Sequence, residues 1–118
     1  MRSFDEAAVR AALRQAWSLE TAKQWTPDCP AAGQCNVTAV VIHDLYGGEI
    51  LQTALSDVVH FYNRVAGRVV DLTDSQFTSP ITYDDAPATR TEAMACVRGS
   101  EYAVLRAALS RLLGGRQF

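Results

Sequence analysis

Three residues far apart in the chain, Cys35, His60 and Asp71, carry the side chains that thiol catalysis uses. A cysteine thiolate is a strong nucleophile, a histidine moves protons near neutral pH, and a carboxylate orients the imidazole ring. In that chemistry Cys35 attacks a carbonyl carbon, His60 takes a proton and later delivers one, and Asp71 stabilises the charged ring. The fold must therefore bring the three side chains together.

Cys35 lies in the first turn of a segment, 34–46, that is apolar on nearly every side and is followed by two glycines. This pattern predicts a helix that is buried all round, although Val40, Val41 and Ile42 also fit a strand. The free amides and the positive dipole at the start of a helix favour a thiolate.

The backbone around Cys35 offers a place for a developing oxyanion. The Cys35 amide, together with the side chain of Gln34, is the predicted donor pair, and Gly33 would let a substrate approach the backbone closely. We expect Trp25 to anchor the preceding loop and to form part of the pocket wall.

The chain contains two histidines, and only one of them suits the role of base. His43 follows Cys35 by eight residues on the same predicted helix, about 12 Å along its axis, and is out of reach. His60 lies in a predicted strand that can cross the helix start, so it is the predicted base.

A hairpin places Asp71 relative to His60. If Ala66 and Gly67 form a two-residue turn, His60 and Asp71 become diagonal neighbours on one face of the two strands. Tyr62 and Thr73 share that face, while a second set points into the core: Val59, Phe61, Val70 and Leu72. A slip of one residue would remove Asp71 and Asn63 from this face and make Asp74 the orienting group. In the first register, Tyr62 and Asn63 are expected to line the pocket.

The remaining elements follow from caps, periodicity and turn residues. Ser3 to Glu6 reads as a capping box that opens an N-terminal helix, and Thr89 to Glu92 reads as a second one. The other expected elements are a loop at 21–33, strands at 50–55, 58–65 and 68–73, an irregular stretch at 76–87, and helices at 92–97 and 100–113. Helices and strands are segregated, which predicts a single α+β domain spanning residues 1–118.

Composition restricts the class of protein. The 118 residues are 48% hydrophobic and 20% charged, with a net charge of −2, as in an ordinary globular domain. Charges of both signs are interspersed, which argues against nucleic acid as the main partner. The longest aliphatic run is far too short to span a membrane, and the N-terminus lacks an apolar signal core, so we expect a cytoplasmic protein. The sequence does not settle its oligomeric state.

The three cysteines, Cys29, Cys35 and Cys96, are an odd number and contain no C-x-x-C motif. A disulfide framework is therefore not expected. The spacing of Cys29, Cys35 and His60 also disfavours a metal site, and no cofactor is predicted.

Several of these residues together resemble the YunG-like family of small, uncharacterised bacterial proteins. The similarity extends over about residues 11–110. It rests on Ala16-Trp17-Ser18, Glu20-Thr21, Trp25, Pro30-Ala31, Gly33-Gln34-Cys35, Val37-Thr38-Ala39, Asp44, Gly47 to Ile50, His60 to Asn63, Asp71 to Thr73, and Gln76-Phe77. This resemblance implies no particular activity.

The order of a cysteine at a helix start, a histidine on a strand and an aspartate on the next strand also resembles papain-like and transglutaminase-like thiol enzymes. That resemblance implies a central helix packed on a small antiparallel sheet. Papain-like enzymes carry a glutamine before the nucleophile as oxyanion donor, whereas Cys29 stands six residues before Cys35 here. The identity of the oxyanion donor is therefore open, with Gln34 as the substitute.

Two classes of function are compatible with the sequence. The first is a thiol hydrolase or acyltransferase acting on an amide of a peptide, protein or small molecule. The second is a non-catalytic binding module on the same fold. A Cys35 sulfur beside the His60 ring and open to a cleft would favour the first, and a buried Cys35 without access to solvent would favour the second.

Overall fold

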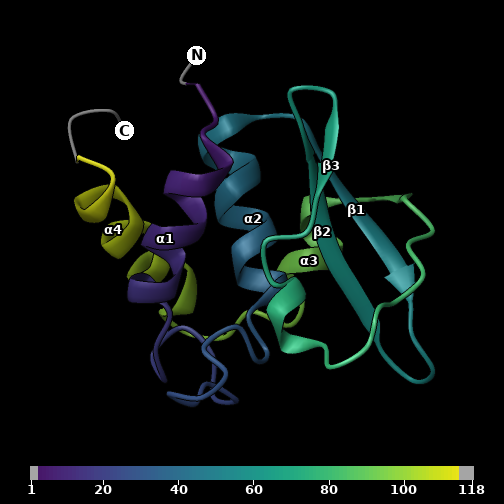
Figure 1. Ribbon diagram of the computed structural model, residues 1–118, viewed down its shortest axis with the longest axis horizontal. Coiled ribbons are helices and arrows are strands. Elements are labelled where there is room, and N and C mark those ends of the chain that lie inside the picture. Colours follow the sequence, from purple (N-terminus) through teal and green to yellow (C-terminus); the bar gives the residue numbers. More distant parts are fainter. Residues whose placement is uncertain (1–2, 115–118) are drawn as a thin grey trace.

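The computed structural model describes residues 3–114 as a mixed α+β fold with a small antiparallel sheet (Figure 1). In chain order the elements are α1 (Glu6–Ala16), α2 (Cys35–Tyr46), β1 (Glu49–Ala54), β2 (Val59–Val65), β3 (Arg68–Val70), the 3₁₀ turn η1 (Asp74–Gln76), β4 (Ala86–Ala88), α3 (Arg90–Met94) and α4 (Glu101–Leu112). Within the described residues, no helix is long and apolar enough to cross a membrane.

Helix α2 lies between the sheet on one side and helices α1 and α4 on the other (Figure 1). Its residues from Val37 to Ile42 are all buried, because it has neighbours on both sides. One core cluster joins α2 to α1 and α4, through residues such as Leu13 and Leu109. A second cluster joins Val40 of α2 to the sheet. The segment is thus a helix, and its uniform apolarity reflects burial from two sides rather than a strand.

The sheet has the strand order β3-β2-β1-β4. Val65 pairs with Arg68 across the turn, as predicted, so the alternative register is wrong. Ala66 and Gly67 have φ values of 52° and 78°, as a primed hairpin turn requires. Strand β3 is shorter than expected and ends at Val70, so Asp71 follows the strand instead of lying within it.

The N-cap of helix α1 lies two residues later in the chain than the predicted N-cap, Ser3. The N-cap is Asp5, whose Oδ1 accepts a hydrogen bond from the Ala8 amide at 3.1 Å. This start leaves Phe4 outside the helix, where its ring packs edge-on against Tyr46 with centroids 5.1 Å apart. The capping box predicted at Ser3 is therefore wrong, whereas the one formed by Thr89 and Glu92 is confirmed at the start of α3.

Two further details differ from the sequence prediction. The stretch expected to be irregular contains β4, a three-residue edge strand in which Pro87 pairs with Leu51. Proline has no amide to donate and marks an edge position, so the sequence signal for this strand was weak. Val59 was assigned to the core, but it is 46% exposed because the start of β2 extends beyond the helices.

Candidate functional site

His60 and Asp71 form a buried pair. Nε2 of His60 lies 2.7 Å from Oδ2 of Asp71, and the two side chains are 2% and 7% exposed. The His60 ring stacks on Tyr62 and meets the edge of Phe77. With Nε2 engaged by the carboxylate, Nδ1 is the ring nitrogen that remains for a second partner.

The Asp71 carboxylate is fixed by more than the histidine. Its Oδ2 also accepts a hydrogen bond from the Tyr83 hydroxyl at 2.6 Å, and its Oδ1 accepts one from the Thr73 amide at 3.1 Å. Burial opposes its ionisation, but the bonds from His60 and Tyr83 hold the pKa of Asp71 below its ordinary value of 3.8. The group therefore stays a carboxylate at neutral pH.

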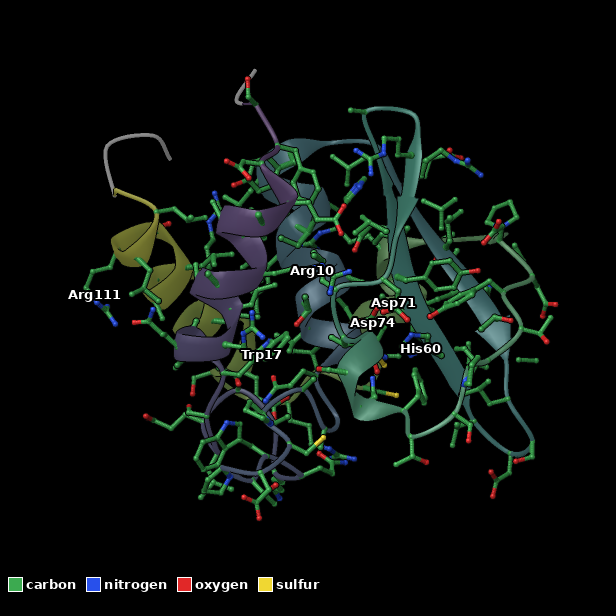
Figure 2. All side chains as sticks on the ribbon, in the orientation of Figure 1. Arg10, Trp17, His60, Asp71, Asp74 and Arg111 are labelled. Atoms are coloured by element: carbon green, nitrogen blue, oxygen red, sulfur yellow. The ribbon has the colours of Figure 1, made fainter. Side chains whose placement is uncertain are left out.

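Arg10 connects this loop to the N-terminal helix. Its guanidinium donates to the Asp71 carbonyl oxygen at 3.0 Å and to Oδ1 of Asp74 at 3.1 Å. Figure 2 shows Arg10, Asp74, Asp71 and His60 gathered between α1 and the sheet. Asp74, the alternative orienting group, is thus paired with Arg10 instead of with the histidine.

Cys35 is the first residue of α2 and is half-buried. It lies near enough to the His60 ring to raise the pKa of that ring. Burial alone would lower the pKa of His60, but the bonds to Asp71 and Cys35 outweigh it and raise this pKa from 6.5 to about 9. At neutral pH the ring is therefore an imidazolium between a carboxylate and the sulfur.

Asn36 is a second polar neighbour of Cys35. The Cys35 thiol donates to Oδ1 of Asn36 at 3.2 Å, and Nδ2 of Asn36 donates to the Ala93 carbonyl oxygen at 3.2 Å. Asn36 therefore links the start of α2 to the backbone of α3.

Cys35 and His60 line the same open cleft, which has a volume of about 730 Å³. One part of its wall is apolar, with Leu55, Val58, Val59, Phe61 and Phe77 among its residues. Amide side chains form another part: Gln24, Asn36, Gln52 and Gln76. The sulfur and the ring therefore face a space that is large enough for a small organic group.

Of the predicted pocket residues around the triad, Gly33 alone is among those that line this cleft. The Gln34 side chain is fully buried, with Oε1 2.8 Å from the Thr21 hydroxyl, so it holds the preceding loop and is not placed to bind an oxyanion. Tyr62 bonds to Asp85, and Asn63 donates to the Ala39 carbonyl oxygen of α2. Trp25 packs on the core as the expected loop anchor. Their predicted pocket roles are corrected accordingly.

The structure adds residues that the sequence prediction missed. Gln24 lines the cleft, and its Oε1 would lie 2.4 Å from a Cβ added to Gly33. Gly33 has a φ of +71°, so glycine is needed here both for the backbone conformation and for space. Tyr83 and Arg10 hold Asp71 from segments that no local pattern connects to it. Among the described residues, no three His, Cys, Asp or Glu side chains are grouped to hold a metal ion.

Comparison with known proteins decides the family. The family model described as YunG protein matches residues 5–114. The chain belongs to the YunG family. It is also 44% identical over 103 residues to the protein described as uncharacterized protein YunG from Bacillus subtilis (strain 168), covering 87% of this chain and 90% of that protein. No solved structure matched the chain.

Proposed function

We propose that this YunG family member is a thiol hydrolase or acyltransferase that acts on an amide bond, with Cys35, His60 and Asp71 as its catalytic set. The observation that carries the proposal is the imidazole of His60, which is held by Asp71 through Nε2 and interacts with Cys35 at the edge of an open cleft. This arrangement supports an imidazolium that can stabilise a thiolate and then protonate a leaving group.

The proposed reaction has two halves. The Cys35 thiolate forms a C–S bond to the amide carbon, and Nδ1 of the imidazolium gives its proton to the departing nitrogen as the C–N bond breaks. The product is a thioester on Cys35 and a free amine. Water, or an amine acceptor in an acyltransferase, then attacks the thioester while His60 takes its proton, and the thiolate leaves.

The oxyanion of this reaction would be stabilised at the start of α2. Gln34 makes no side-chain cap bond there, so the first-turn amides, including that of Cys35, have no cap to satisfy them. The amide side chain of Gln24 lies in the same cleft and is the second candidate donor, in place of Gln34. A cysteine at a helix start with a histidine on a strand and an aspartate after the next strand resembles the papain-like and transglutaminase-like arrangement.

The decisive test is the rate at which iodoacetamide alkylates each cysteine as a function of pH, followed by mass spectrometry. In His60→Gln, alkylation of Cys35 at pH 7 should slow by about tenfold or more, because the charge that stabilises the thiolate is lost. His43→Gln is the matched control. His43 lies on α2, the helix that carries Cys35, but it does not line the cleft. Cys29 serves as an internal reference in each sample.

A second readout tests chemistry on an acyl group. Incubation with a p-nitrophenyl ester should transfer the acyl group to Cys35 and release nitrophenol, whereas Cys35→Ser should remain unmodified. Equal alkylation rates in the wild type and in His60→Gln, together with no acylation, would refute the catalytic set. The cleft would then belong to a binding module.

A further inference from the structure

The wall of the cleft beside Cys35 carries exposed aliphatic side chains. Val58 is 59% exposed and Val59 is 46% exposed, and both line the cleft together with Leu55, Phe61 and Phe77. Exposed valines have an unfavourable contact with water that a ligand can remove. They come from the β1–β2 hairpin and line the same cleft as Cys35 and His60, so a group that contacts them shares that cleft with the reacting atoms.

The charges of the cleft favour a neutral ligand over an anionic one. Among the described residues that line it there is no lysine or arginine, and Glu92 is the one carboxylate. A carboxylate on a ligand would find no cation there except the imidazolium, whose Nε2 already has the Asp71 carboxylate as its partner at 2.7 Å. Such a ligand would lose its hydration without a compensating ion pair.

We infer that the cleft binds an uncharged aliphatic group of the substrate, and that Val58 and Val59 form the surface it contacts. The inference rests on the proposed function, because it concerns substrate selection at the same thiol. The amide side chains of Gln52 and Asn36 are bonded to backbone carbonyls, so they form fixed polar edges around the apolar wall. The preferred substrate is therefore an amide whose neighbouring group is aliphatic and carries no carboxylate.

The test compares three alkylating agents that all form a C–S bond with Cys35 and release iodide. They are iodoacetamide, N-hexyl iodoacetamide and 6-(iodoacetamido)hexanoic acid. Relative to iodoacetamide, the N-hexyl reagent should react about tenfold faster at Cys35, the factor expected from burying about two methylene groups of its chain in this open cleft. Its rate should also saturate with concentration, and the carboxylate reagent should lose most of the gain. At Cys29, which does not line the cleft, the three rates should be similar.

In the double variant Val58→Ser/Val59→Ser, the N-hexyl reagent and iodoacetamide should alkylate Cys35 at nearly the same rate, so the ratio of the two rates should fall to near one. The two rates are compared within the same variant, so a change in the iodoacetamide rate itself does not affect the ratio. Val69→Ser is the matched control, because Val69 is 42% exposed but lies on β3, away from the cleft. The saturation measurement on the wild type needs no variant and holds even if the double variant does not fold.

The inference would be overturned if the two reagents alkylated Cys35 of the wild type at nearly equal rates and the rate with the N-hexyl reagent rose linearly with its concentration. A carboxylate reagent as fast as the N-hexyl reagent would overturn its charge argument. These failures are distinct from failure of the proposed function. A thiol that reacts equally fast without His60 but keeps the preference for the N-hexyl reagent would refute the catalytic set and leave the aliphatic site in place.

Discussion

At the scale of single residues, the site depends on how Asp71 holds Nε2 of the His60 ring. The carboxylate accepts from His60, Tyr83 and Thr73, so its position does not depend on the histidine alone. Such a group fixes the ring tautomer and stabilises the imidazolium. In the proposed mechanism Asp71 is a positioning residue, because it acts on the sulfur through the His60 ring.

Asp71→Asn tests this role. An amide can still accept from His60, but it no longer favours the charged ring, so alkylation of Cys35 at pH 7 should slow by roughly threefold to tenfold. The effect should be smaller than that of His60→Gln and should move the pH profile of the rate. Asp74→Asn is the control, because Asp74 pairs with Arg10. Equal rates in the two asparagine variants would remove Asp71 from the site.

At the scale of elements, the connection between α2 and β1 positions the sheet against the helix that carries Cys35. Helix α2 ends at a glycine pair in which Gly47 has a φ of 79° and Gly48 a φ of 77°. A Cβ on Gly48 would lie 2.1 Å from the carbonyl oxygen of Arg64 in β2. The backbone of β2 thus packs directly on this turn.

Gly48→Ala should therefore destabilise the protein by roughly 3 kcal/mol or more, because the strained φ adds to a clash with backbone. Gly67→Ala is the matched control. It has a similar φ of 78° but no atom within 4 Å of the added Cβ, so it should cost about 1–2 kcal/mol. Denaturant unfolding measures both. Equal decreases in the free energy of unfolding for the two variants would show that the turn can move away from Arg64.

At the scale of the whole molecule, the His60–Asp71 pair contributes to stability in a way that depends on pH. The folded-state pKa of His60 is raised from 6.5 to about 9. The stabilisation is complete below about pH 6.5, decreases as the unfolded chain loses its proton, and is gone once the folded ring titrates near pH 9. On the acid side it falls as the pH drops through the lowered pKa of Asp71.

Thermal unfolding of the wild type and of His60→Gln checks this linkage. The wild type should be more stable near pH 6, by roughly 2–4 kcal/mol for a buried pair that loses one partner. The difference should shrink steadily between pH 6.5 and 9.5. A difference that does not change with pH would mean that His60 stabilises the fold by packing alone.

Local patterns in the sequence were sufficient to predict several elements of the fold. The apolar segment after Cys35 with its glycine stop predicted α2, and Ala66-Gly67 predicted the hairpin register that places Asp71 near His60. These signals are local, because burial fixes the periodicity of a helix and a two-residue turn fixes strand pairing. The cap of α1 was placed wrongly, since Ser3 and Asp5 both suit an N-cap and the packing of Phe4 on Tyr46 decides between them.

Which polar side chains face the cleft depends on tertiary packing and could not be predicted from local patterns. Gln34 and Gln24 are equally suited to donate to an oxyanion by residue type, but Gln34 is buried against Thr21 and Gln24 lines the cleft. The support of Asp71 by Tyr83 and Arg10 likewise comes from segments 12 and 61 residues away. Side-chain direction in loops and contacts over such separations depend on how the layers pack, and no local periodicity records that packing.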